Sequence, residues 1–375
     1  VRVYKQNVDL ITREMVDYNE YFVDPIDWHV FERHSHSADE MKCCWPQEFT
    51  AEKASLCREH ANTDQGCAEI LEMCERANLK TCSGKTYGFL WNAKNKLWDK
   101  KQKKTIFSVI MRRILPLIRR NVPEQFQSRW TESKKSHAFF NYFWDYCIDE
   151  EFERNKNIQF PHYLPIKYGQ VLDLRTGMMQ ERTREMLYTF ECPVDFKDRE
   201  CPNAEKFFNQ IMDNKGRYHY FQTQLGYCLT GETSLRTLFL WFGAGANGKG
   251  VVAKIMQKIL GEYFQQISRA AVIKHRHEES ASSATAHLMA LKQARMCIAA
   301  ELRDGDKLND SFIKTVTGED AISGRALYGE QENFALQTKI VIQTNYIADM
   351  DVTQAMRDRT QITNFRARFA ANPRG

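Results

Sequence analysis

The chain has 375 residues, of which 43% are hydrophobic, and its net charge is only +5. This length predicts two or three domains with sizeable cores, and the modest charge excludes a uniformly basic protein, so any nucleic-acid surface must be local. No apolar run approaches the roughly 18 residues of a membrane span, and no signal peptide opens the chain. Eleven cysteines in no regular framework favour a reducing, intracellular compartment. Because the chain stops soon after a strand-like segment, we expect it to be a piece of a longer protein.

Residues 1–84 form a polar, mixed region that we assign as an accessory region, with one or two helices expected between Glu52 and Ala77. Its histidines and cysteines invite a zinc interpretation, but only Cys57 and His60 have ligand spacing and no C-x₂-C pair is present. We therefore favour buried or incidental thiols over a metal site.

Residues 85–200 are predicted to form a mixed α+β region. Two short strands at 87–92 and 97–98 precede a helix over about 103–120, with apolar side chains on one face and arginines on the other. A solvated helix face and a nucleic-acid contact explain those arginines equally well. The remaining predicted elements of this region are an aromatic-rich helix over 136–153, a β-hairpin over 164–175, a strand over 182–190 and a charged linker from Pro193 to Pro202.

Residues 201–375 are predicted to form an α/β core that opens with helices over 204–229. An apolar run at 237–242 predicts a buried strand, and 251–260 predicts a helix that ends at Gly261. The loop between them has the spacing G-x-x-x-x-G-K, in which backbone N–H groups and the helix N-terminus hold phosphates and Lys249 neutralises their charge. A glycine turn that binds nothing is the alternative. The residues assigned to nucleotide binding are Gly243, Ala244, Gly245, Ala246, Asn247, Gly248, Lys249, Gly250 and Val251.

Acidic residues follow the next predicted strand, 295–300. This strand ends at Glu301, 52 residues after Lys249, and a carboxylate there orients Mg²⁺ or the attacking water. Asp304 is either a second metal ligand or a solvated loop residue. Gly250 stands where such loops usually carry a Ser or Thr that holds Mg²⁺, so either water and a distant carboxylate hold the metal or catalysis is impaired.

The last predicted elements are a short amphipathic helix over 307–314, a hairpin over 321–336 and buried strands over 339–345 and 360–365. Asn345 ends the first of these strands, where its amide can reach the γ-phosphate or its water; a turn-forming asparagine is the alternative. Arg359 precedes the last strand, from which an arginine could reach a neighbouring subunit's nucleotide as a finger.

With these residues assembled, the chain resembles the superfamily 3 helicases, above all the primase–helicase NTPases of poxviruses and other large DNA viruses. The resemblance covers about residues 87–365 and rests on the glycine loop with its asparagine before Gly-Lys, on Glu301, on Thr344–Asn345 and on the segments 314–320 and 325–328. The nucleotide motifs fall within 96 residues, from Lys249 to Asn345, which is typical of that superfamily.

The resemblance implies an AAA+ P-loop core, a parallel sheet flanked by helices, that uses ATP and Mg²⁺. Lys249 would hold the triphosphate, Glu301 would act with the metal and the lytic water, Asn345 would be the sensor and Arg359 the finger supplied in trans. The residues implied to line a pore and grip single-stranded DNA are Lys307, Lys314 and Arg325. The departures from the family pattern are Gly250, Arg303 in place of a second acid, Gly-Glu-Asp for Gly-Gly-Asp at 318–320, and no proline after Asn345.

From these features we predict an ATP-dependent DNA helicase of viral or mobile-element replication that works as a homo-hexamer on single-stranded or forked DNA. A primase domain upstream and other replication proteins are the expected partners, and no membrane partner is expected. The expected location is the host cytoplasm or a viral replication site. Two alternatives stay open: a P-loop motor that acts on other cargo, and a nucleotide-binding scaffold with impaired turnover.

Overall fold

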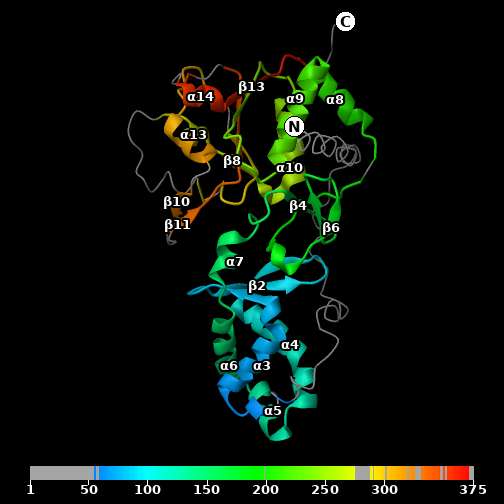
Figure 1. Cartoon of the computed structure of the whole chain (residues 1–375), viewed down its shortest axis with the longest axis vertical. Helices are drawn as coiled ribbons and strands as arrows, with labels where there is room; N and C mark the ends of the chain where they lie inside the picture. The colour runs from blue at the N-terminus through cyan, green and yellow to red at the C-terminus, as the bar shows by residue number, and fades with distance from the viewer. Residues whose placement is uncertain are drawn as a thin grey trace. The chain divides into compact units, whose positions relative to one another are not determined.

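The structure, a computed structural model, describes part of the chain, in two compact units (Figure 1). Unit 1 includes Phe160–Glu181 and Glu191–Gly375, and unit 2 includes Asp27–Gln159 and Arg182–Phe190. Our boundaries after residues 84 and 200 stay a prediction, but residues 160–181 group with the core rather than with the preceding helices. The described residues are 55, 59–197, 199–274, 288–289, 291–299, 302–318, 321–325, 331–346, 349–350 and 353–370.

Unit 2, as far as it is described, packs helices on a small antiparallel sheet of order β1-β2-β3. Its strands are β1 (Leu79–Thr81), β2 (Tyr87–Asn92) and β3 (Leu97–Gln102). Its helices are α3 (Asp64–Glu75), α4 (Lys103–Asn121), α5 (Glu124–Thr131), α6 (Ser133–Tyr146) and α7 (Glu150–Asn155). Apolar side chains recur every three or four residues along α4 and α6, so each helix turns one face into a shared core.

Two predictions in unit 2 are wrong. The helix expected over 136–153 is broken into α6 and α7, because Thr81 exchanges backbone hydrogen bonds with Cys147 and Asp149, and the Asp149 side chain caps α7 by accepting from the N–H of Phe152 at 2.8 Å. The strand expected over 182–190 is instead a 3₁₀ turn (Arg184–Met186) followed by Leu187 at φ 54°. The strands at 87–92 and 97–98 and the helix from 103 are confirmed.

The core of unit 1 is a five-stranded, wholly parallel sheet of order β13-β7-β12-β9-β8 in the described residues. Its strands are β7 (Leu238–Phe242), β8 (Phe264–Ile267), β9 (Met296–Ala299), β12 (Lys339–Thr344) and β13 (Thr360–Asn364). The predicted α/β core is therefore confirmed, and so is the mixed helix-and-strand region before it. The buried runs of apolar residues in β7, β9 and β12 are what a strand covered on both faces requires.

Helices cover both faces of this sheet. Leu238 and Leu240 of β7 face a core that includes side chains of α13 and α14, whereas Phe239 and Trp241 face α9, where Phe221 meets the Trp241 ring at 5.4 Å between centroids. The helices of unit 1 are α8 (Pro202–Met212), α9 (Lys215–Leu229), α10 (Lys249–Leu260), α11 (Arg269–Val272), α13 (Asp310–Thr317) and α14 (Gln354–Arg359).

Two smaller strand groups complete unit 1. The predicted hairpin over 164–175 is confirmed as β4 (Tyr163–Ile166) with β5 (Gln170–Asp173), which β6 (Met179–Glu181) extends, and the hairpin over 321–336 is confirmed as β10 (Ile322–Arg325) with β11 (Gln331–Phe334). The helix expected over 307–314 begins later, at Asp310, because the Asn309 side chain caps it by accepting from the N–H of Phe312. Among the described residues, no helix combines the length and apolar composition needed to cross a membrane.

Candidate nucleotide site

The predicted phosphate-binding loop joins the end of β7 to the start of α10. Gly243 and Gly248 have φ angles of 150° and 92°, and a Cβ on Gly243 would lie 2.3 Å from the Phe365 carbonyl oxygen. These two positions therefore require glycine, whereas a Cβ on Gly245 would meet nothing within 4 Å. Ala244, Gly245 and Ala246 are exposed, so the outer part of the loop is open to a ligand.

Asn247 holds the loop closed from inside. Its side chain is buried, its Oδ1 accepts from the Lys249 N–H at 3.4 Å, and its Nδ2 donates to the carbonyl of Phe365 at 3.4 Å. The asparagine before Gly-Lys is thus a structural residue of the loop that ties it to the chain leaving β13. This fixes the N-terminus of α10, where free N–H groups favour an anion.

Lys249 lies at the carboxyl edge of the sheet, between two strands. Its side chain is buried, and its Nζ donates to the carbonyl of Gly243 and, at 3.0 Å, to Oδ1 of Asn345. The strand register explains the meeting, because Phe242 of β7 pairs with Thr344 of β12 and the next residue of each strand begins a loop at the same level. The structure therefore brings together Lys249 and Asn345, two of the predicted catalytic residues.

The first turn of α10 contains Gly250 and Val251, both exposed. A Cβ on Gly250 would meet no atom within 4 Å, so space for the missing hydroxyl is present although the hydroxyl is not. The Lys249 amine, the backbone N–H groups of the loop and the Asn345 carboxamide fit the phosphates of a nucleoside triphosphate. A metal ion here would depend on carboxylates from the loop after β9.

Glu301 lies outside the described residues, so its predicted role stays a prediction. Asp304 is exposed on the loop that follows. Sequence reasoning missed Asp306 on that loop, which accepts from the N–H of Arg303 at 2.7 Å and from the Arg269 guanidinium at 2.5 and 2.6 Å. Partial burial acts to raise the pKa of Asp306, but the bonds to Arg269 and Arg303 outweigh it and the pKa is lowered. Asp306 is therefore an ionised carboxylate whose hydrogen bonds to Arg269 and Arg303 hold the loop that carries Asp304.

Arg359 lies in the last turn of α14, at the opposite edge of the sheet from the glycine loop. The next residue, Thr360, pairs with Leu238 at the start of β7, whereas the loop follows Phe242 at its end. Four residues of strand place these two levels about 13 Å apart. Arg359 donates from Nη1 to the carbonyl of Ala355 at 3.0 Å, and its Nε is buried with no hydrogen-bond partner in the described residues. Arg359 therefore lies at the amino edge of the sheet, away from the glycine loop of the same chain.

The predicted DNA-contacting residues lie on separate elements. Lys307 is half-buried in a loop that forms a backbone bridge to Asp349, and Lys314 is half-buried on α13. Arg325 is the last residue of β10, and its side chain lies outside the described part. Their role in DNA binding stays a prediction.

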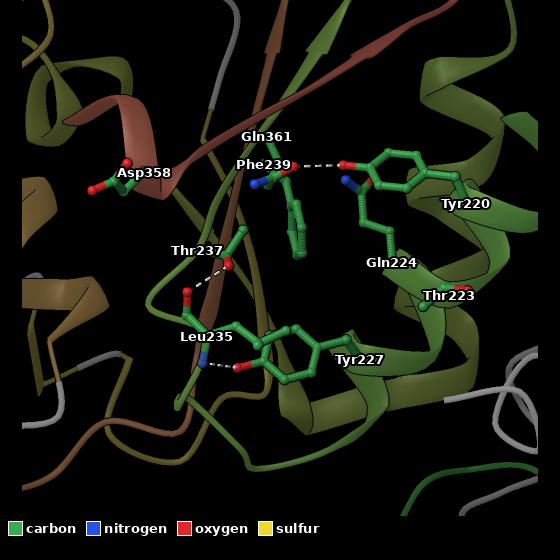
Figure 2. Close-up of a pocket in the computed structure, with 9 residues that line it drawn as sticks. All are labelled: Tyr220, Thr223, Gln224, Tyr227, Leu235, Thr237, Phe239, Asp358 and Gln361. Carbon is green, nitrogen blue, oxygen red and sulfur yellow. Dashed lines mark hydrogen bonds between the residues drawn. The ribbon is translucent and has the colours of Figure 1, made fainter. Parts of the chain in front are cut away.

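A separate cavity of about 260 Å³ lies between α9 and the β7–β13 edge (Figure 2). Tyr220 donates to Oε1 of Gln361 at 3.0 Å on one side, and the hydroxyl of Tyr227 accepts from the N–H of Leu235 at 3.3 Å on the other (Figure 2). Of the residues lining it, Phe239 lies in the amino half of β7 and Thr237 directly precedes that strand, so this cavity is distinct from the glycine loop. Within the described residues, no cluster of three or more His, Cys, Asp or Glu side chains is placed to hold a metal ion.

Comparison with known proteins gives relatives in large DNA viruses. A protein of Acanthamoeba polyphaga mimivirus named "putative helicase" is 28% identical over 206 residues, which cover 53% of this chain and 21% of that protein. One of frog virus 3, also named "putative helicase", is 24% identical over 192 residues (50% and 19%), and one of African swine fever virus, named "putative primase", is 25% identical over 116 residues (31% and 12%). The chain is a relative of viral proteins named as helicases and primases. The resemblance drawn from its motifs is confirmed to that extent.

The chain spans about a fifth of the length of the two helicase-named relatives that it matches, and no protein-family model matches it. Among solved structures, the C-terminal region of NrS-1 matches 79% of this chain and 60% of its own, with a TM-score of 0.45 and 10% identity, a similarity too low to assign a function.

Proposed function

We propose that this chain is the motor part of an ATP-dependent DNA helicase of viral DNA replication. The observation that carries the proposal is the meeting of Lys249 with Asn345 at the carboxyl edge of a parallel sheet, beside a glycine loop that opens a helix. Helicase and primase names among the viral relatives support the same activity. A primase domain elsewhere in the full protein and other replication proteins would be its partners, at a viral replication site or in the host cytoplasm.

In this proposal the residues of the loop bind and the residues beyond it act on the triphosphate. Lys249 moves from Asn345 to the β/γ phosphates, which leaves the Asn345 amide free to orient the attacking water or the γ-phosphate. Glu301, with Asp304 nearby, would hold Mg²⁺ and polarise that water. When bound, Mg²⁺ neutralises the charge that develops between the β and γ phosphates. The lack of a hydroxyl at Gly250 makes the metal more dependent on these carboxylates.

The position of Arg359 supports a ring-shaped assembly as part of this proposal. Arg359 and the glycine loop of the same chain lie at opposite ends of β7, about 13 Å apart along the strand. For Arg359 to act as a finger, we therefore propose that it completes the site of a neighbouring copy. Each copy would then give and receive a finger, a head-to-tail arrangement that forms a cyclic homo-oligomer such as a hexamer when the rotation between neighbours closes. Lys307, Lys314 and Arg325 would contact the phosphates of single-stranded DNA in its pore, with an affinity that falls as salt rises.

The test is ATP hydrolysis with and without single-stranded DNA, with Lys249→Ala as the inactive variant. Lys254→Ala is the matched control, since Lys254 is an exposed lysine on the same helix, five residues further on. Hydrolysis that DNA stimulates, that Lys249→Ala abolishes and that Lys254→Ala preserves supports the helicase. Hydrolysis that DNA leaves unchanged favours a motor on other cargo, and ATP binding without hydrolysis in a sample of ring size favours a scaffold, the role that Gly250 suggests.

A further inference from the structure

The helix α4 of unit 2 carries an unusual charge. Its 19 residues, Lys103–Asn121, include two lysines, four arginines and no acidic residue, a net charge of +6. The whole chain has a net charge of +5, so this one helix exceeds the charge of the entire protein. A local basic surface of this kind is the electrostatic footprint expected of a polyanion-binding site.

The cations of α4 form an exposed stripe. Successive residues of an α-helix are rotated by about 100° about its axis. Lys104, Arg112 and Arg119 therefore lie within about 80° of one another around the axis and span about 22 Å along it. All three are exposed. The other side of α4 is buried in the core with α3 and α6, and it consists of Ile106, Ile110, Ile114 and Ile118. The stripe is therefore fixed outward by the packing of the core.

Among the described residues, the stripe has no acidic partner. Arg113, which points inward, pairs with the buried Glu75 at 3.5 Å. By contrast, no ion pair joins Lys104, Arg112 or Arg119 to any acidic side chain in the described part of the chain. The positive charges on the outward face thus stay available to a ligand.

The position of the lysines works against the stability of the helix itself. Lys103 and Lys104 occupy the first turn, where the helix dipole disfavours cations by about 0.3–1 kcal/mol each, and no side chain caps this end. Arg119 and Arg120 in the last turn are favourable by the same rule. Helix stability therefore explains only Arg119 and Arg120, two of the six cations. Lys103 lies over the Trp144 ring at 4.9 Å, which leaves Lys104 as the first-turn cation that an anionic partner would stabilise.

We propose that the α4 stripe, Lys104, Arg112 and Arg119, binds the phosphate backbone of a nucleic acid, as a contact in unit 2 additional to the pore residues of unit 1. About 22 Å of helix corresponds to about six nucleotides at 3.4 Å of axial rise, so three cations can each meet a phosphate of one strand. Such contacts carry no sequence information and hold the strand in place. Only the identification of that nucleic acid as the DNA of the motor rests on the proposed function.

The test is the salt dependence of binding to a fluorescent oligonucleotide by the full chain without ATP. In Lys104→Ala/Arg112→Ala/Arg119→Ala, loss of three phosphate contacts should make the slope of log K against log salt shallower by about 2, and weaken binding up to about a hundredfold at 0.1 M salt. The matched control is Lys85→Ala/Lys134→Ala/Lys206→Ala, which removes three exposed lysines elsewhere and should keep the wild-type slope.

A charge-preserving variant, Lys104→Arg/Arg112→Lys/Arg119→Lys, should also keep the slope, which separates charge from folding. An unchanged slope in the alanine variant, or an equal change in the control, would overturn the proposal. Binding of poly-glutamate more tightly than the oligonucleotide would assign the stripe to an acidic protein and overturn it as well. Because no ATP is used, the slope can change even if the chain hydrolyses nothing, so failure of the motor and failure of this inference are distinguishable.

Discussion

Lys249 Nζ lies 3.0 Å from Oδ1 of Asn345, a hydrogen bond between residues 96 positions apart in the sequence. It joins the loop after β7 to the end of β12, two strands that are neighbours in the sheet. A lysine held by a neutral carboxamide can exchange that partner for a phosphate without leaving a buried charge unpaired. The pair therefore links occupation of the glycine loop to the freedom of the Asn345 side chain.

Asn345→Ala should lower the rate of ATP hydrolysis by about 10²–10³-fold, the range found when one preorganised hydrogen-bond donor is removed, while ATP affinity is retained. Affinity is retained because the variant frees Lys249 rather than removing it. Measurement of kcat beside the Kd of a fluorescent ATP analogue checks this. Asn209→Ala, on the exposed side of α8, is the control. An unchanged kcat would return Asn345 to the turn-forming interpretation.

The elements of the core could be predicted because buried parallel strands read as uninterrupted apolar runs. The runs ending at Phe242, Ala299 and Thr344 each form the predicted strand. Glycine requirements at Gly243 and Gly248 also follow from the loop pattern. What lies within one short stretch of chain was thus accessible from the sequence.

Pairings between distant segments could not be predicted. Nothing local indicates that Thr81 interrupts the helix before Asp149, or that Asp306 pairs with Arg269, 37 residues earlier. The register that sets Thr344 opposite Phe242 is likewise a property of the assembled sheet. Periodicity reports burial along one element, whereas register depends on the fit between elements.

Gly250→Ser should restore a hydroxyl ligand for Mg²⁺. A Cβ at this position meets nothing within 4 Å, so the side chain fits. The Mg²⁺ concentration that half-saturates hydrolysis should fall by about tenfold, the lower end of the effect of an oriented metal-site partner. Gly250→Ala is the matched control, because it gives the same gain of about 0.4–1 kcal/mol from a less flexible unfolded chain but no hydroxyl. Equal Mg²⁺ dependence in the two variants would contradict the assignment.

Arg359→Ala and Lys249→Ala should each be inactive alone but active when mixed. If the finger acts in trans, an Arg359→Ala copy retains a complete loop that a Lys249→Ala neighbour can serve with its own arginine. In an equal, random mixture, about one neighbouring pair in four has an Arg359→Ala copy whose site faces the arginine of a Lys249→Ala copy. About a quarter of wild-type hydrolysis should therefore return. Arg357→Ala, an exposed arginine of the same helix, should stay active. A mixture as inactive as its components would contradict a finger in trans.

Lys339 anchors the other end of β12, opposite Asn345. It is 2% exposed, and its Nζ donates to the carbonyl of Thr230 and, at 2.9 Å, to that of Gln337, so it ties the strand to the end of α9. Burial lowers the pKa of Lys339 to about 7, with a smaller lowering by Arg295, while Cys228 and Glu232 act in the opposite direction. In the unfolded chain the lysine titrates near 10.4.

Stability should therefore rise with pH because of this one side chain. Between about pH 7 and 10.4 the unfolded state keeps the proton and the folded state does not, so the free energy of unfolding increases across that window, and below about pH 7 this dependence vanishes. The free energy of unfolding in urea should accordingly rise from about pH 7 to 10 for wild type relative to Lys339→Met. Cys228→Ser controls for the adjacent thiol, whose pKa burial raises to about 12. A difference that stays flat would show that Lys339 keeps its proton when buried.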